Sequence, residues 1–230
     1  MTKEGIQAKK CKIALIGGRG LLGQQLKGIF PHATLIERGE SDLNVLGLNY
    51  DLCFICAPSA LKWYANKNPK NDLNEVKSLI NLITSLKSRR FILFSTIDAI
   101  KNSTLSDKKA TKNHYGLHRK LVEDFVLQHE SGSVVRLGAL LGGFVEKNFL
   151  VDIKEQNLSY LPNPNSQFQF SNLFEFRELA EMICETEFKS LNYFSAPIAI
   201  NTIYNQLSND FPKLKFFNTN SHIIKNVAHI

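Results

Sequence analysis

Three glycines mark the first place in the chain where residue types and their spacing suggest chemistry. Gly17, Gly20 and Gly23 are spaced three residues apart, directly after the apolar run 12–16 and directly before a segment with helical spacing. Backbone N–H groups at the amino end of a helix bind a pyrophosphate when no side chain blocks them, and the last glycine lets helix and strand approach closely. We therefore predict a dinucleotide site at this turn, including Leu21 and Leu22. The alternative is a glycine-rich turn that binds nothing.

Two charged residues, Glu37 and Arg38, end the second apolar run and bear on which dinucleotide binds. An acidic side chain at this position holds a ribose 2′-hydroxyl, whereas an arginine accommodates a 2′-phosphate. Glu37 therefore favours NAD, and Arg38 favours NADP. We expect NAD and leave NADP open. A solvated pair that does neither is a further alternative.

A second group of reactive side chains lies in the middle of the chain. Ser95 and Thr96 end an apolar run, and Tyr115 begins a helical segment that has Arg119 four residues later and Lys120 five residues later. A hydroxyl can hold a substrate oxygen while a phenol transfers a proton. At about 100° per residue, Arg119 shares the Tyr115 face and Lys120 does not. We interpret His114 and His118 as polar helix residues rather than proton shuttles.

Alternating strands and helices must position these residues. Strands are expected at 12–17, 33–36, 50–57, 91–95 and 133–137, and helices at 21–30, 71–86, 115–128 and 174–185, because apolar residues recur with the matching periods. Apolar residues on both faces of the strands indicate a parallel sheet covered on both sides. The predicted fold is an α/β, Rossmann-type, doubly wound sheet, with a dinucleotide-binding core at 1–143 and a small cap at 144–230 that packs partly back on the core.

These segments resemble the extended short-chain dehydrogenase/reductase family, which includes NAD-dependent epimerases, dehydratases and reductases of nucleotide sugars. The run Phe91–Ile97 is similar to the family strand that ends in a catalytic Ser or Thr, and the segment Tyr115-Gly-Leu-His-Arg119 is similar to its Tyr-x-x-x-Lys helix. The resemblance implies that Tyr115 is the acid/base and Thr96 orients the substrate oxygen. Arg119 stands where the family has lysine, and an arginine fork does not reproduce the point charge of lysine.

The same resemblance implies further contacts. For the cofactor these are Asp42 and Leu43 near the adenine, Ala57 and Pro58 after the third strand, and Arg119 at the ribose. For the substrate they are Ser95, Thr96 and Asn148, and Glu123 is implied to be a structural partner. Together, Tyr115-Gly-Leu-His-Arg119 and the run Asn165–Phe170 are similar to epimerase-like proteins of bacterial surface-polysaccharide biosynthesis.

The bulk composition limits the remaining functional classes. The 230 residues carry a formal net charge of +7, but the basic residues are scattered, so we expect no nucleic-acid partner. Cys53 and Cys56 lie three apart on a strand and point to opposite faces, so we expect free thiols and no metal site. No signal peptide or membrane span is recognisable, which predicts a cytoplasmic protein.

The resulting interpretation is an NAD(P)-dependent oxidoreductase or epimerase that acts on a nucleotide sugar, with a homodimer possible. The alternative is a non-catalytic dinucleotide-binding regulator of the atypical short-chain dehydrogenase type. Tyr115 favours the enzyme, and the missing lysine favours the regulator.

Overall fold

The computed structural model describes residues 11–40, 42–101, 113–142, 145, 150, 166–203 and 205. Contacts within the chain divide it into two units. The first comprises Met1–Arg136 and Glu175–Asn192, and the second comprises Leu137–Phe174 and Tyr193–Ile230. The helix and strand at 176–193 thus belong almost wholly with the first unit. The expected division at residue 143 stays a prediction.

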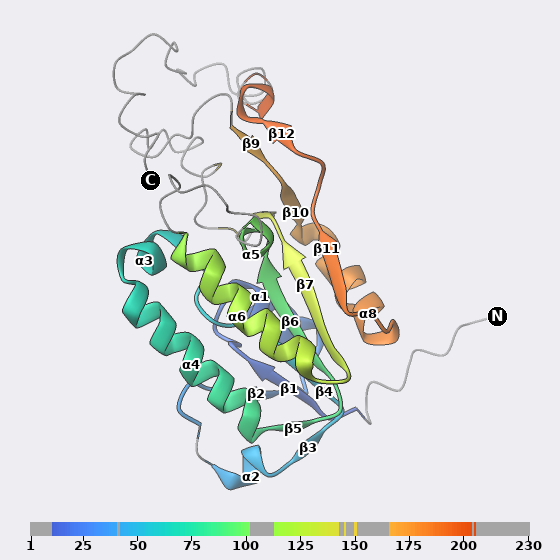
Figure 1. Ribbon diagram of the computed structural model, residues 1–230. Helices are drawn as coiled ribbons and strands as arrows, with labels where there is room; N and C mark the ends of the chain where they lie inside the picture. Colours follow the sequence, from blue (N-terminus) through green and yellow to red (C-terminus); the bar gives the residue numbers. More distant parts are fainter. Residues whose placement is uncertain are drawn as a thin grey trace, which may run out of the picture. The chain divides into compact units, whose positions relative to one another are not determined.

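A six-stranded sheet forms the centre of the first unit (Figure 1). Its strands run in the order β11-β7-β6-β4-β1-β2. Their bounds are Ile13–Ile16 for β1, Thr34–Ile36 for β2, Leu52–Ile55 for β4, Phe91–Thr96 for β6, Gly132–Leu137 for β7 and Ser190–Tyr193 for β11. The pairs β1–β2, β1–β4 and β4–β6 are parallel. The α/β Rossmann-type fold predicted from the sequence is therefore confirmed.

Helices cover both faces of this sheet (Figure 1). On one face lie α4 (Pro69–Ser85) and α6 (His114–Gln128), and their buried residues Val76 and Val122 join the strand residues Ala14, Cys53 and Leu93 in one apolar cluster. On the other face lie α1 (Leu21–Ile29) and α8 (Phe176–Glu185).

Aromatic rings fill the face under α1 and α8. Phe54 stacks on Phe30 at 5.4 Å between ring centroids, and Phe94 lies 6.2 Å from Phe54 and 5.5 Å from Phe176. Successive strand residues point to opposite faces, so β4 contributes Cys53 to one core layer and Phe54 to the other. This explains why the strands are apolar without alternation.

Short elements complete the first unit. They are α2 (Leu43–Leu46), α3 (Lys62–Lys67), α5 (Asp98–Lys101) and the parallel pair β3 (Asn49–Tyr50) and β5 (Lys87–Ser88). Figure 1 shows α3, α5 and the amino end of α6 beyond the carboxyl end of β6. The sequence patterns did not predict β11, α3 or the β3–β5 pair.

The second unit contains two small sheets. β8 (Ala139–Leu141) pairs in parallel with β10 (Phe170–Asn172), and β9 (Gln167–Phe168) pairs antiparallel with β12 (Ile198–Ala199). The short helix η2 (Leu173–Glu175) follows β10. The sequence also predicts a helix at 149–153 and a strand at 213–217, but these segments lie almost entirely outside the described residues. Among the described residues, no helix has the length and apolar character needed to cross a membrane.

Candidate active site

The turn between β1 and α1 is closely packed at two of its three regularly spaced glycines. Gly17 has a positive φ of 81°, and a Cβ there would lie 2.6 Å from the carbonyl oxygen of Cys56. A Cβ on Gly23 would lie 2.2 Å from the carbonyl oxygen of Gly17. Gly17 and Gly23 are therefore required by the fold itself, because strand, turn and helix leave no room for a side chain.

Gly20 differs from the other two glycines. A Cβ there would contact only the carbonyl oxygen of Gly17, at 3.5 Å, and the backbone angles of −75° and 166° suit any residue. Gly20 is the N-cap of α1, no side chain caps the helix, and the first turn, which includes Leu21 and Leu22, carries no acidic residue. Uncapped N–H groups beside open space fit a dinucleotide phosphate.

The strand order places this turn at a point of the sheet that is suited to ligand binding. From β1 the chain proceeds to β2 on one side and, after a crossover, to β4 on the other. Ligands of open α/β sheets bind beyond the carboxyl ends of strands where the order reverses in this way. Ala57 and Pro58 follow β4 at this edge, and the Cys56 amide donates to the Ile16 carbonyl at 2.9 Å.

The predicted ribose-binding residues are engaged in surface ion pairs. Arg19 of the glycine turn donates through Nε to Glu37 at 3.1 Å, and Arg38 lies 3.2 Å from Glu75 of α4. Asp42 accepts from the Asn44 amide at 2.8 Å. The Leu43 side chain lies outside the described part of the chain. These pairs place a carboxylate and an arginine together at the end of β2, so the choice between NAD and NADP stays a prediction.

Tyr115 is buried at the start of α6. Asn113 caps the helix by accepting from the Gly116 amide at 3.2 Å, and the Tyr115 amide donates to Asn66 of α3 at 3.0 Å. The Tyr115 side chain forms a hydrogen bond with Thr96, the last residue of β6. The Thr96 hydroxyl also accepts a hydrogen bond from the Asp98 amide at 3.2 Å. The structure thus brings the two predicted hydroxyl groups together.

The surroundings of Tyr115 raise its pKa above the ordinary value. Burial is the largest cause, because the phenolate loses hydration, and the Asp98 carboxylate acts in the same direction. The charge of Arg119 and hydrogen bonds with Thr96 and Arg119 oppose this effect without cancelling it. Tyr115 is therefore a neutral phenol at neutral pH.

Arg119 lies on the Tyr115 face of α6, as helix geometry predicts. Its guanidinium carbon is 4.3 Å from the centroid of the Tyr115 ring, and the residue is 5% exposed. Lys120 pairs instead with Asp124 one turn further along α6. The cation that accompanies the tyrosine is thus an arginine stacked on the ring.

Sequence reasoning missed the partner of this arginine, which is Asp72 in the first turn of α4. Asp72 accepts from Arg119 Nη1 at 3.0 Å and Nη2 at 2.9 Å, and it meets His118 Nδ1 at 2.6 Å. The buried residues of α4 are Asp72, Val76, Leu79 and Ile83. The signal that would have identified Asp72 is its position four residues before Val76, because residues spaced four apart lie on the same, here buried, face of a helix.

Two other polar groups near the site are buried. Ser95 Oγ has no hydrogen-bond partner among the described residues. Glu123 is fully buried and accepts from Arg136 Nε at 2.9 Å and Nη2 at 2.7 Å, which agrees with the structural role expected for it. The predicted substrate residue Asn148 lies outside the described residues.

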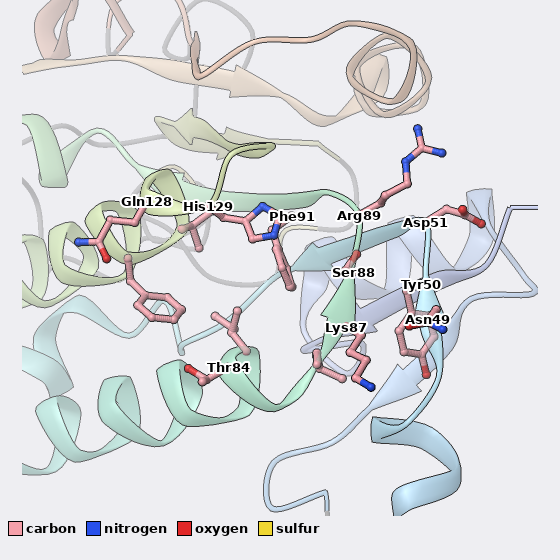
Figure 2. Close-up of a pocket in the computed structure, with 14 residues that line it drawn as sticks. Asn49, Tyr50, Asp51, Thr84, Lys87, Ser88, Arg89, Phe91, Gln128 and His129 are labelled. Carbon is pink, nitrogen blue, oxygen red and sulfur yellow. The ribbon is translucent and has the colours of Figure 1, made fainter.

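Clefts elsewhere in the first unit lie at the opposite edge of the sheet. One, of about 650 Å³, is lined by residues that precede β4 and β6, including Asp51, Lys87 and Arg89 (Figure 2). Figure 2 shows that Lys87 and Arg89 extend away from each other, so they do not converge on one ligand. The described residues contain no group of three His, Cys, Asp or Glu side chains that could hold a metal ion.

Comparison with known proteins relates this chain to solved structures only at the level of fold. No family model and no curated protein sequence matches. An NAD-dependent NDP-hexosamine 5,6-dehydratase of tunicamycin biosynthesis aligns with a TM-score of 0.69 at 16% identity, over 90% of this chain and 83% of that one. At this identity the similarity concerns the fold.

Two further structures show the same similarity. The UDP-N-acetylglucosamine 4-epimerase of Methanobrevibacter ruminantium aligns with a TM-score of 0.70 at 14% identity, over 88% of this chain and 83% of that one. RMD of Pseudomonas aeruginosa, solved with NADPH, gives a TM-score of 0.66 at 15% identity, with 86% and 82% covered. The predicted resemblance to nucleotide-sugar epimerases, dehydratases and reductases is therefore confirmed for the fold.

Proposed function

We propose that this chain binds NAD or NADP at the glycine turn and transfers a hydride to or from a carbon of a nucleotide sugar. The single observation that carries the proposal is the buried contact of Tyr115 with Thr96 and Arg119 beyond the carboxyl end of β6. A nicotinamide supplies or accepts the hydride when bound. The chain must then hold the reacting oxygen and move its proton.

Each residue of the site has a distinct part in this proposal. Gly17, Gly20 and Gly23 leave the amino end of α1 open for the pyrophosphate. Thr96 holds the reacting oxygen of the substrate, and Tyr115 exchanges a proton with that oxygen. Ser95, whose hydroxyl has no partner among the described residues, is a second group for the substrate. The nucleotide sugar and its use in bacterial surface-polysaccharide biosynthesis rest on the segments Tyr115–Arg119 and Asn165–Phe170.

Cofactor binding is tested by calorimetry on a Gly20→Val variant with NAD, NADH, NADP and NADPH. The structure has room for a Cβ at Gly20, so this variant is expected to fold and to lose binding, because the side chain occupies the phosphate space. Gly28→Val is the matched control, since a Cβ on Gly28 meets no atom within 4 Å at the other end of the same helix. Equal binding by both variants would place the cofactor elsewhere.

Turnover is tested with a panel of nucleotide sugars and both reduced and oxidised cofactors, followed at the reduced-nicotinamide absorbance. Tyr115→Phe keeps the ring but removes the proton, so we expect turnover to fall by a factor on the order of 10² or more while cofactor affinity is unchanged. Tyr50→Phe is the control, because the Tyr50 hydroxyl donates to Val45 at 3.0 Å at the opposite edge of the sheet. Full turnover by Tyr115→Phe would exclude this tyrosine as the acid/base.

One observation favours a second function, a dinucleotide-binding regulator without catalysis. Asp72 accepts from both terminal nitrogens of Arg119, and Nη2 also donates to the Ser59 carbonyl at 2.5 Å, so the guanidinium is held by groups of the chain itself. Tight dinucleotide binding together with no turnover on the whole panel would support this function.

A further inference from the structure

The buried carboxylate Asp72 organises the polar side chains beneath Tyr115. Its side chain is 4% exposed and holds the Arg119 guanidinium through two hydrogen bonds, one to each terminal nitrogen. His118 Nδ1 meets the same carboxylate from one residue earlier on α6. A two-point pair of this kind fixes the plane of the guanidinium as well as its position.

This geometry fixes Arg119 relative to the tyrosine. With Nη1 and Nη2 held by Asp72 and by the Ser59 carbonyl, the guanidinium stacks on the Tyr115 ring. The remaining nitrogen, Nε, is buried and has no partner among the described residues. Arg119 therefore packs on the Tyr115 ring.

The charged groups near the phenol each have a partner of opposite charge, and the Arg119 charge still acts to lower the Tyr115 pKa. The cation of Arg119 is matched by the anion of Asp72, and Asp98 of α5 is matched by Lys62 of α3 at 2.9 Å. The other titratable neighbours on α6 are His118 and His114, whose rings are 5.8 Å apart. A cation whose charge is compensated stabilises a phenolate far less than an unpaired cation does.

We propose that Asp72 is a positioning residue that fixes the Arg119 guanidinium against the Tyr115 ring and weakens the attraction of that cation for a Tyr115 phenolate. This inference rests on the proposed function, in which Tyr115 exchanges a proton with the reacting oxygen of the substrate.

The proposal is tested by titrating the tyrosines through their phenolate absorbance, which requires neither cofactor nor substrate. The Tyr115 step is the difference between the native chain and Tyr115→Phe. In the native chain we expect this step above the ordinary tyrosine value of 10.0. In Asp72→Asn it should move down by about one pH unit or more, a tenfold loss of proton affinity, because the Arg119 charge is then uncompensated.

Two controls separate this role from a purely structural one. Asp124→Asn removes an exposed carboxylate from the same helix and should leave the Tyr115 step unchanged. The double variant Asp72→Asn with Arg119→Gln removes both charges, so its Tyr115 step should lie at or above the native step, because the attraction that Arg119 exerts in the native chain is lost as well. This variant also avoids an unpaired buried charge if the single variant does not fold. The proposal would be overturned by an unchanged step in folded Asp72→Asn. It would also be overturned by a double variant whose step lies below the native one, or by a native step below 10.0. Absence of turnover with the expected titrations would overturn only the proposed function.

Discussion

At the scale of single residues, the glycines of the turn fall into two groups. Gly17 and Gly23 are required by packing, because a Cβ on either would collide with a backbone oxygen. A Cβ on Gly20 would make only an ordinary contact of 3.5 Å with the Gly17 oxygen, so packing does not require a glycine there. We therefore expect substitution of Gly17 or Gly23 to affect stability, and substitution of Gly20 to affect the proposed cofactor binding.

Stability measurements on Gly23→Ala test this packing requirement. The added methyl would stand 2.2 Å from the Gly17 oxygen, which backbone movement must relieve, so we expect a loss of about 1–3 kcal/mol in the free energy of unfolding. Gly28→Ala on the same helix should instead gain about 0.5–1 kcal/mol, since open space surrounds it. Denaturant unfolding of both variants measures the difference. Equal effects would contradict the close approach of α1 and the turn.

The choice between NAD and NADP also depends on single residues. Glu37 repels a 2′-phosphate and binds Arg19, so the native chain should prefer NAD over NADP. Glu37→Gln removes the repulsion and frees Arg19, and we expect the ratio of the two dissociation constants to shift toward NADP by about tenfold, or about 1.4 kcal/mol. Titration calorimetry with both cofactors measures this. Tighter binding of NADP by the native chain would reverse the assignment.

At the scale of elements, α6 is held in place by charged as well as apolar residues. Its buried residues include His118, Arg119 and Glu123, which meet Asp72 on α4 and Arg136 on β7. Buried charges without partners are costly, so these pairs fix the position of α6 between α4 and β7. The position of Tyr115 depends on this placement, because α6 carries it.

We expect Glu123→Gln to loosen α6 from β7. Arg136, with 14% of its side chain exposed, would lose its charge partner, and the free energy of unfolding should fall by roughly 3 kcal/mol. The neighbouring Asp124→Asn removes an exposed carboxylate and should cost less than about 0.5 kcal/mol. Chemical denaturation gives both values. Similar costs for the two variants would show that burial does not distinguish the pairs.

At the scale of the whole molecule, the buried carboxylate Asp72 links stability to pH. Burial alone raises the pKa of Asp72, but hydrogen bonds from Arg119 and His118 and their charges outweigh it, and the net pKa lies below the ordinary 3.8. The folded state therefore favours the ionised form. The stability this provides is present in full above pH 3.8 and is lost as the pH falls through the lower folded value.

Acid unfolding of the whole chain tests this link. The native protein should lose stability as the pH falls below 3.8, whereas Asp72→Asn should be less stable at neutral pH and show a shallower decline in that range. Thermal unfolding between pH 2 and 7, with the NAD-free protein, measures both slopes. Parallel curves for the two proteins would mean that Asp72 has the same pKa in the folded and unfolded chain.

The sequence by itself determined the features that depend on neighbours along the chain. Strand and helix periods predicted β1, β4, β6 and α6, because apolar spacing reflects which faces are covered. Helix geometry placed Arg119 rather than Lys120 beside Tyr115, because both residues lie on one helix. Glycine spacing located the tight turn between β1 and α1 for the same local reason.

Only the tertiary structure decided the features that depend on distant segments. Asp72 is 47 residues from Arg119, and no local pattern states that α4 and α6 lie side by side. The pairing decides that Arg119 is bound to Asp72 and stacked on the Tyr115 ring. The difference between Gly20 and Gly23 and the addition of β11 to the sheet likewise follow from packing between elements, which a sequence period does not record.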